Sequence, residues 1–303
     1  MNTNKYLISI IGPTAIGKTA LSIQLAQHFN TEILSADSRQ FFKNMSIGTA
    51  APTPTELAAA KHHFIHHKLV EDNYNVGAFE KDAIKLLNTI YKNHQVAIMV
   101  GGSGLYVDAV TKGLDDFPEI DVTIRETLNK TLQNEGLKTL QNQLKTLDLE
   151  SYNTIAIDNP HRVIRALEIC IGTNKPYSSF LNKKKEPRNF KTISIGLIAE
   201  RSIIYDRINQ RVDKMMTEGL LEEVKNLQSK QHLNALNTVG YTELFKYLNG
   251  EWSLDFAISE IKKNSRRFAK RQLTWFKKNT ETHWFDYQTP TTELISKIEI
   301  ELK

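Results

Sequence analysis

Cysteine is nearly absent from this sequence, which has 303 residues and a single thiol at Cys170. One thiol cannot form a disulfide within the chain or supply a cysteine-rich metal site. Long apolar runs are also missing, because the run at residues 6–11 is too short for a membrane span or a signal peptide. With 40% hydrophobic and 24% charged residues, we expect a globular cytoplasmic protein.

Positive charge is concentrated in one segment of the chain. The net charge is +5, and residues 257–278 contain eight basic side chains and one acidic one, so the rest of the chain has a net charge of −2. Apolar residues at Ile258, Ile261, Phe268 and Phe276 predict an amphipathic helix with a basic side. Such a helix fits RNA, and Trp275 could stack on an unpaired base. A membrane surface or a partner protein is the alternative.

The spacing of apolar residues predicts an α/β core with a helical insertion. A continuous apolar run predicts a buried parallel strand at residues 6–11, and residues 31–36, 95–100 and 192–199 are predicted to be further strands. A helix predicted at 18–29 connects the first two strands, which indicates a doubly wound parallel sheet. Helical periodicity dominates after residue 117. We therefore assign 1–117 and 190–303 to the core and 118–189 to the insertion, which ends in the polar stretch 182–189. The last hundred residues are expected to be helical, most regularly at 205–227 and 257–279.

A phosphate-binding loop follows the first predicted strand. Residues 12–19 read GPTAIGKT and fit the pattern G-x-x-x-x-G-K-[ST], with the members Gly12, Pro13, Thr14, Ala15, Ile16, Gly17, Lys18 and Thr19. In such loops the backbone N–H groups and the N-terminus of the next helix face a di- or triphosphate. The lysine adds a charge, and the threonine hydroxyl can bind Mg²⁺. The loop alone does not distinguish a nucleotide kinase or an ATPase from a transferase of another diphosphate-linked group.

Asp37 comes directly after the second predicted strand. Ligands of open α/β sheets bind beyond the carboxyl ends of the strands, so the carboxylate is predicted to face the phosphates. A turn or helix cap for residues 38–40 is the alternative.

Seven segments together resemble the bacterial tRNA dimethylallyltransferase family, also called tRNA isopentenyltransferases. They are GPTAIGKT (12–19), SADSRQFFKNMSIGTA (35–50), VGGSGLYVDAV (100–110), DNPHRVIRALEI (158–169), YDRINQRVDKMMTEGLLEEV (205–224), VGYTEL (239–244) and AKRQLTWFKK (269–278). The resemblance covers nearly the whole chain. It implies a P-loop NTPase-like core, and a helical insertion that binds the anticodon stem-loop of tRNA.

The resemblance also implies the reaction and its residues. Residues 14–19 would hold the diphosphate of dimethylallyl diphosphate, and Asp37 would take a proton from the exocyclic amine (N6) of the adenine just 3′ of the anticodon. Arg211 would bind the diphosphate as it leaves. This chemistry suits the residue types, because Lys18, Arg211 and a Mg²⁺ on Thr19 can stabilise negative charge on the departing oxygens. Asp37 is the only acid that the sequence places near the loop.

The implied tRNA contacts extend over the whole chain. They are Asp37, Ser38, Arg39, Gln40, Ser103, Arg125, His161, Arg162, Val163, Ile164, Arg165, Lys270, Arg271, Gln272 and Trp275. The sequence departs from the family pattern at Ser103 and His161, where threonine and glutamine are usual, and at Ala51 and Thr242, where basic residues are common. The expected partners are tRNA and dimethylallyl diphosphate, with no membrane, for a chain that acts as a monomer.

Two other interpretations remain open from the residues themselves. A phosphoryl-transfer enzyme would need a second Mg²⁺-associated acid at a strand end, where this sequence has glycines after Val100. An RNA-binding ATPase without transferase activity would use the loop and the basic helix. The histidines at 62, 63, 66 and 67 could also bind a metal if they lay on a helix, at spacing i, i+4.

Overall fold

The computed structural model describes residues 4–183 and 187–303. It divides into two compact units, Met1–Lys112 with Arg188–Lys303, and Gly113–Pro187. The polar stretch 182–189, with which the insertion is predicted to end, lies partly outside the described residues. Within the described part of the chain, no helix has both the length and the apolar character needed to cross a bilayer.

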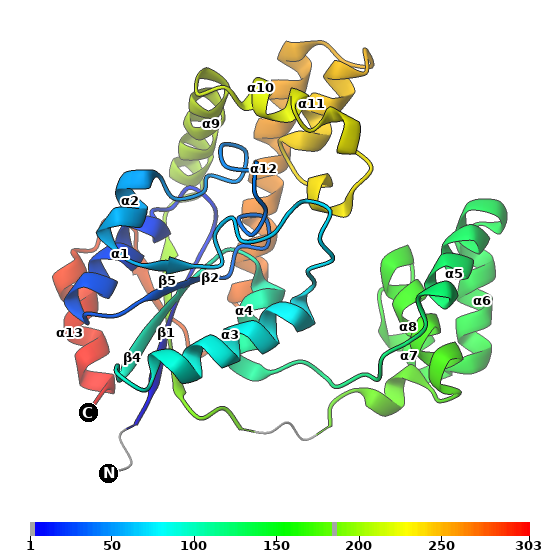
Figure 1. The fold of residues 1–303 in the computed structure, drawn as a ribbon, viewed down its shortest axis with the longest axis horizontal. Coiled ribbons are helices and arrows are strands. Elements are labelled where there is room, and N and C mark those ends of the chain that lie inside the picture. Colours follow the sequence, from blue (N-terminus) through cyan, green and yellow to red (C-terminus); the bar gives the residue numbers. More distant parts are fainter. Residues whose placement is uncertain (1–3, 184–186) are drawn as a thin grey trace. The chain divides into compact units, whose positions relative to one another are not determined.

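The first unit contains a six-stranded sheet in which every strand pair is parallel (Figure 1). The strand order is β3-β2-β4-β1-β5-β6. The strands are β1 (Tyr6–Ile11), β2 (Ile33–Ser35), β3 (His62–His63), β4 (Val96–Val100), β5 (Lys191–Ile198) and β6 (His283–Asp286). β1 lies in the middle and is buried along its full length, as expected for a parallel strand covered on both faces. The predicted doubly wound α/β core is confirmed.

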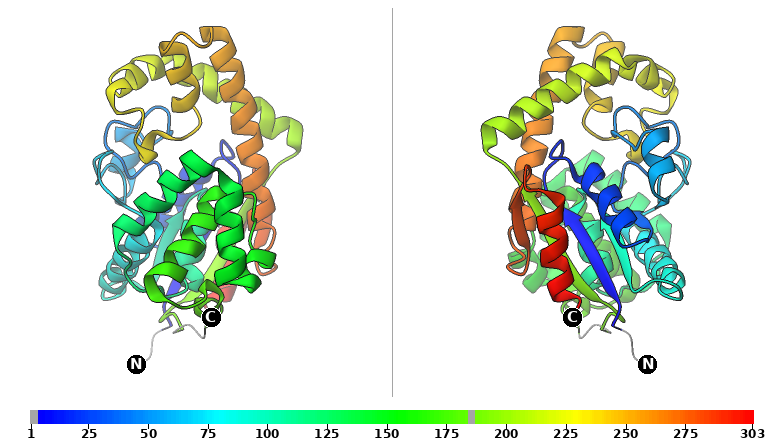
Figure 2. Two further views of the ribbon diagram at one scale, coloured as in Figure 1. Left: turned by 90° about the vertical axis from the view of Figure 1, so that its right-hand side faces the viewer. Right: turned by 90° about the vertical axis from the view of Figure 1, so that its left-hand side faces the viewer.

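Helices cover both faces of this sheet. On one face, Ile8 and Ile10 of β1 belong to the same apolar core as α1 (Lys18–His28) and α13 (Thr291–Glu301). On the other, Leu7 and Ile11 belong to the core formed with α3 (Val76–Ile90) and α4 (Gly104–Lys112). Figure 2 shows α13 (red) close to β1 and α1 (blue). The alternation of β1 side chains thus decides which helix each one contacts.

The remaining helices of this unit lie beyond the carboxyl ends of the strands, except that the last of them runs back beside the sheet, where Ala269 and Phe276 join its apolar cores (Figure 1). They are α2 (Pro54–Ala59), α9 (Arg201–Thr217), α10 (Leu220–Lys225), α11 (Tyr241–Leu248) and α12 (Leu254–Phe276). The single helix predicted over 205–227 is wrong, because Gly219 has a φ of 101° and separates α9 from α10. Such a positive φ ends a right-handed helix and suits glycine. α12 buries Ala257, Ile261, Ala269 and Phe276.

The second unit is helical over its described residues and has its own core. Its elements are α5 (Val122–Glu135), α6 (Leu137–Leu147), α7 (Leu149–Thr154), α8 (Pro160–Thr173) and the 3₁₀ turn η1 (Tyr177–Phe180). Leu128, Leu140, Leu144 and Leu167 meet in the core, and Cys170 packs there as predicted.

Two edge strands, β3 and β6, were not predicted. β3 pairs with β2 over two residues, and β6 extends the sheet beside β5. Neither has the apolar run of a central strand, so their extended form depends on the neighbouring strand. β6 also corrects the expectation of a helical C-terminal third.

Candidate functional site

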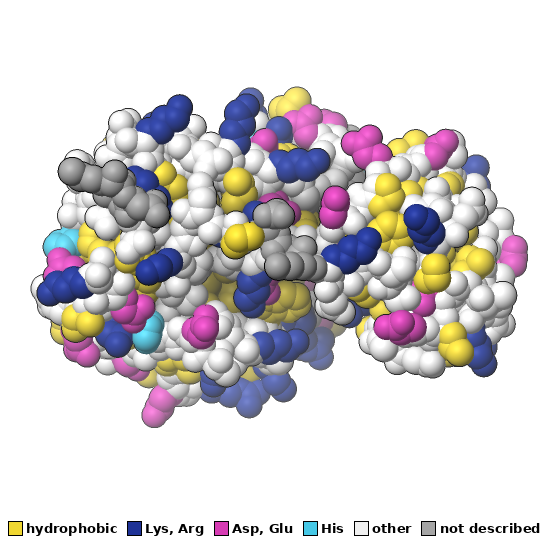
Figure 3. Space-filling model, turned by 90° about the horizontal axis from the view of Figure 1, so that it is seen from below, with side chains coloured by type: hydrophobic (Ala, Val, Ile, Leu, Met, Phe, Trp, Pro, Cys, Tyr) yellow, Lys and Arg dark blue, Asp and Glu magenta, His cyan; other side chains and the backbone are white. Residues whose placement is uncertain are grey.

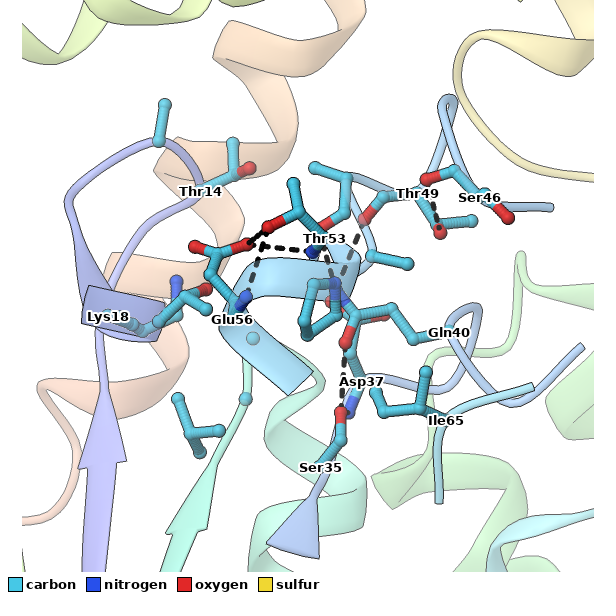
Figure 4. Close-up of a pocket in the computed structure, with 18 of the residues that line it drawn as sticks. Thr14, Lys18, Ser35, Asp37, Gln40, Ser46, Thr49, Thr53, Glu56 and Ile65 are labelled. Carbon is cyan, nitrogen blue, oxygen red and sulfur yellow. Dashed lines mark hydrogen bonds between the residues drawn. The ribbon is translucent and has the colours of Figure 1, made fainter. Parts of the chain in front are cut away.

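The predicted phosphate-binding loop, residues 12–19 and called the phosphate loop below, joins β1 to α1 and borders a cavity. Gly12 and Gly17 have φ values of 143° and 108°, which only glycine adopts readily. The Lys18 ammonium turns back over the loop and donates to the carbonyl oxygens of Gly12 (3.1 Å) and Pro13 (2.8 Å). Figure 4 shows Thr14 and Lys18 on this side of the cavity, whose volume is about 740 Å³.

Asp37 follows β2 at the same edge of the sheet and lines the same cavity (Figure 4). Its Oδ1 accepts the backbone N–H of Arg39 (3.1 Å), so the carboxylate caps the turn as well as facing the cavity. Burial raises the pKa of Asp37 above its usual range, although Lys18 and Arg211 oppose the shift. Burial lowers the pKa of Lys18 to about 7, with Arg211 adding to the shift and Asp37 opposing it. Both groups therefore titrate closer to neutrality than they would in water.

A second cavity, of about 510 Å³, adjoins the first. Thr14, Asp37 and Arg211 line both cavities. The phosphate loop and the carboxylate thus lie where two cavities meet.

Two arginines of α9 contact the phosphate loop. Arg211 Nη1 lies 3.3 Å from Thr14 Oγ1, and Arg207 Nε donates to the carbonyl oxygen of Ala15 (2.7 Å). The sequence prediction included Arg211 and missed Arg207. Their spacing of four places both on one face of a helix, and this signal could have identified the second arginine.

Gln272 is predicted to contact tRNA, but the structure places its side chain inside the protein. It is 5% exposed. Its Oε1 accepts the Thr14 N–H (2.8 Å), and its Nε2 donates to the Gly102 carbonyl oxygen (2.9 Å). A Cβ on Gly102 would lie 2.2 Å from that Nε2, so a larger residue here would displace the Gln272 amide. The amide therefore ties the phosphate loop to the loop after β4.

The segment after Asp37 is held mainly by internal hydrogen bonds. Arg39 donates from its guanidinium to the carbonyl oxygens of residues 234, 235 and 237. Gln40 accepts from the Ser35 hydroxyl and donates to the carbonyl oxygens of residues 49 and 50. Ser103 accepts the Ser38 N–H (3.1 Å) and its hydroxyl lies 3.2 Å from that of Ser38. Ser38, Arg39 and Ser103 line the second cavity, and Gln40 lines the first.

The basic residues on α12 and just past its end differ in their exposure and partners. Lys262 and Lys263 pair with Asp213 and Glu260. Arg266 is half-buried and donates to Asn209 Oδ1 (2.7 Å). The exposed group, called the basic stripe below, lies at spacings of three to four residues or about twice that, and consists of Arg267, Lys270 and Arg271 on the helix and Lys277 and Lys278 just past its end. On the face drawn in Figure 3, basic and acidic side chains are interspersed, so positive charge does not cover the protein uniformly. Trp275 is half-buried and donates from Nε1 to Asp108 Oδ2 (2.8 Å).

In the second unit, a buried carboxylate holds two arginines. Glu168 accepts two hydrogen bonds from Arg125 (3.3 and 2.9 Å) and one from Arg165 (2.9 Å). Burial alone would raise the pKa of Glu168, but the two guanidinium groups outweigh it and the pKa lies below its usual value. Both arginines stay partly exposed, at 48% and 40% of their side chains.

The other predicted contacts of this unit lie on α8. His161 and Arg162 are exposed at its first turn. Val163 and Ile164 are 0% and 3% exposed and pack in the helical core. Their inclusion among the tRNA contacts is corrected, because buried aliphatic side chains of a helix cannot reach an RNA surface.

The expectation that Asp37 is the only acid near the loop is wrong. Glu56 and Glu218 line the same cavity, and Glu56 accepts from the N–H and hydroxyl of Thr53 (Figure 4). The helical arrangement considered for the four histidines is also wrong. Residues 62 and 63 form β3, and His66 has a φ of 47°. Among residues 4–183 and 187–303, no three His, Cys, Asp or Glu side chains gather as metal ligands would.

Comparisons with known proteins agree on one family. The family model described as IPP transferase matches residues 40–279. A tRNA dimethylallyltransferase of Christiangramia forsetii is 60% identical over 98% of both chains, and one of Flavobacterium johnsoniae is 57% identical over 99% of both.

Solved structures give the same result. The tRNA isopentenylpyrophosphate transferase of Bacillus halodurans has a TM-score of 0.74 and 36% identity, covering 98% of this chain and 97% of its own. A eukaryotic dimethylallyltransferase, described as acting on tRNA, has a TM-score of 0.82 and 25% identity, covering 98% of this chain and 80% of its own.

Proposed function

This chain belongs to the IPP transferase family, and we propose that it transfers the dimethylallyl group of dimethylallyl diphosphate to N6 of the adenine 3′-adjacent to the anticodon in tRNA. The observation that carries this proposal is the junction of two cavities at Thr14, Asp37 and Arg211. A diphosphate held by residues 14–19 in one cavity would meet, at this junction, a base that enters from the other. A base stacked in a tRNA loop must leave the stack to do so.

The reaction breaks the bond between C1 of the dimethylallyl group and the diphosphate oxygen, and it forms a bond between C1 and N6. Negative charge grows on the departing oxygens, and Lys18 and Arg211 supply the matching positive charge. N6 loses a proton to the ionised Asp37 carboxylate. Because Asp37 Oδ1 is fixed by the Arg39 N–H, the carboxylate is already oriented before substrate binds.

Magnesium fits this site through one protein ligand. Thr19 lies in the first turn of α1 and lines the diphosphate cavity, and its hydroxyl together with phosphate oxygens would give Mg²⁺ the oxygen ligands it prefers. A bound Mg²⁺ would add positive charge beside the leaving diphosphate.

The tRNA would be held by the exposed arginines and histidine of the second unit, and by the basic stripe of α12. Arg125, His161, Arg162 and Arg165 are the candidates in the second unit. A tRNA substrate implies that the protein works in the cytoplasm, and one chain contains all the residues used here, so a monomer suffices.

The test replaces Asp37 by asparagine, which retains an oxygen for the Arg39 N–H and removes the base. We expect single-turnover transfer to fall by about 10² to 10⁴-fold, with the binding of tRNA and dimethylallyl diphosphate unchanged. Glu56→Gln, in the second acid of the cavity, is the matched control and should transfer normally. A wild-type rate of single-turnover transfer in Asp37→Asn would refute the assignment of Asp37 as the base. Labelled phosphate transfer from ATP, without prenyl transfer, would instead support a phosphoryl-transfer enzyme.

A further inference from the structure

A carboxylate from α10 holds the backbone of the segment Ser46–Gly48. Glu223 Oε2 accepts the N–H groups of Ser46 (2.9 Å) and Ile47 (2.8 Å), and its Oε1 accepts that of Gly48 (2.9 Å). The Tyr241 hydroxyl, from α11, donates to the same Oε1 (2.6 Å). Three successive N–H groups thus converge on one side chain that lies about 175 residues away in the sequence. No sequence pattern indicated this role for Glu223.

The segment held in this way borders both cavities. Ser46 and Ile47 line the first cavity, Gly48 lines the second, and Thr49 and Ala50 line both. Residues 46–50 are therefore part of the wall at which the two cavities meet. In Figure 4, Ser46 and Thr49 lie on the side of the cavity opposite Lys18.

The wall has a second attachment close to the reacting groups. Gln40 Nε2 donates to the carbonyl oxygens of Thr49 (3.3 Å) and Ala50 (3.1 Å), and Gln40 follows Asp37 by three residues. Glu223 thus fixes the outer part of the wall, and Gln40 fixes the part next to the carboxylate. A shift at one attachment would be passed to the other through two or three residues of backbone.

The segment depends on these attachments because its own conformation is unfavourable. It consists of turns, and Ala50 has a φ of 48°, in the left-handed region that residues with a Cβ rarely adopt. Tyr241 packs so tightly on Gly48 that a Cβ there would lie 2.5 Å from the ring. Without Glu223, three N–H groups would lose a charged acceptor at once, and such bonds are stronger than those between neutral groups.

We propose that Glu223 is a positioning residue for the transfer reaction, which sets the wall between the two cavities and through it the alignment of the two substrates. The proposal rests on the function proposed above for its substrates. Glu223 touches no reacting atom, and it acts through residues 46–50. Tyr241 orients the carboxylate and presses on Gly48.

The test compares Glu223→Gln with Glu222→Gln, which removes the same charge from the neighbouring residue. Glu222 is 69% exposed and pairs only with Lys225 among the described contacts. Glutamine at 223 replaces one acceptor oxygen by an NH₂ group that faces N–H groups. Well below the melting temperature, we expect kcat to fall by about ten- to a hundredfold, as misplacement of substrates by about 1 Å can cause. Glu222→Gln should stay within about twofold of wild type.

Hydrogen exchange gives a readout that does not depend on the substrates. The amides of Ser46, Ile47 and Gly48 should exchange faster in Glu223→Gln, and at the wild-type rate in Glu222→Gln. Tyr241→Phe removes one hydrogen bond and keeps the ring, so it should give intermediate exchange and an intermediate kcat if Glu223→Gln folds poorly.

Each other outcome refutes a different part of the reasoning. Unchanged exchange at these amides would show that Glu223 does not hold the backbone of residues 46–48. Faster exchange with kcat and both KM values unchanged would reduce Glu223 to a structural role. If exchange is faster in Glu223→Gln but the wild-type protein transfers no dimethylallyl group, the proposed function is refuted, and the attachment of residues 46–48 to Glu223 still holds.

Discussion

Gln272 offers a direct choice between the prediction from sequence and the contacts in the structure. If Gln272 binds RNA, Gln272→Leu should weaken tRNA binding and leave stability unchanged. If it joins two loops, the same change removes the partners of the Thr14 N–H and the Gly102 carbonyl. Leucine has nearly the same volume, so the loss is polar and little cavity is created.

The size of the effect follows from the burial of the two bonds. The bond to Gly102 is buried, and an unsatisfied buried group costs about 1–3 kcal/mol. The bond to Thr14 is only partly buried, so water can replace the lost partner and the cost is about 1 kcal/mol. We expect the free energy of unfolding to fall by about 2–4 kcal/mol, which a typical domain survives. The KM for dimethylallyl diphosphate should rise, since Thr14 also contacts Arg211.

Denaturant unfolding and steady-state kinetics would measure these changes. Gln272→Glu separates the two bonds, because a carboxylate still accepts the Thr14 N–H but opposes the Gly102 carbonyl oxygen. Gln210→Leu is the control, as Gln210 is exposed on α9 and bonds Asp206. The reasoning fails if the free energy of unfolding of Gln272→Leu lies within about 0.5 kcal/mol of the wild-type value while its affinity for tRNA falls.

Three further predictions concern charge. Because the pKa of Lys18 is lowered to about 7, its ammonium loses a proton in the free protein as pH rises through that value, and a bound diphosphate favours the charged form. Diphosphate affinity should therefore fall by up to about tenfold per pH unit above 7, and calorimetry at pH 8 in two buffers should detect proton uptake that Lys18→Arg abolishes. Glu168→Gln removes a negative charge and so raises the net charge by one, yet it should weaken tRNA binding by about two- to fivefold because the two arginines lose the carboxylate that orients them. Tighter binding in a filter assay would contradict this. When acidic residues replace Arg267, Lys270 and Arg271, the salt dependence of tRNA binding should flatten by about 0.7–0.9 for each tRNA phosphate that the protein no longer neutralises.

Much of the architecture could be predicted from local patterns. The apolar run of β1 and the glycines of the phosphate loop specify a buried parallel strand and a turn that only glycine permits. The position of Asp37 at the end of β2 then follows, because carboxyl ends of parallel strands lie at one edge of a sheet. The family resemblance was inferred in part from these same segments. The 60% identity to a relative supports it.

Local patterns failed where a contact with a distant segment determines the structure. β3 and β6 are short and lack an apolar run, and they are strands because β2 and β5 offer them free edges. The break between α9 and α10 was missed because leucine and valine continue the helical spacing across Gly219.

The sequence by itself determined the elements whose causes lie within a few residues: the phosphate loop, the central strands and the basic stripe of α12. Tertiary structure alone decided the partners of the long polar side chains. Hydrophobic periodicity predicts which side of a helix is buried, but it does not predict which backbone group will form a hydrogen bond with a buried glutamine or glutamate. Gln272 and Glu223 bond to groups about 258 and 175 residues away. Those partners exist only when the folded chain brings the loops after β1, β2 and β4 together with the C-terminal helices at the carboxyl ends of the strands.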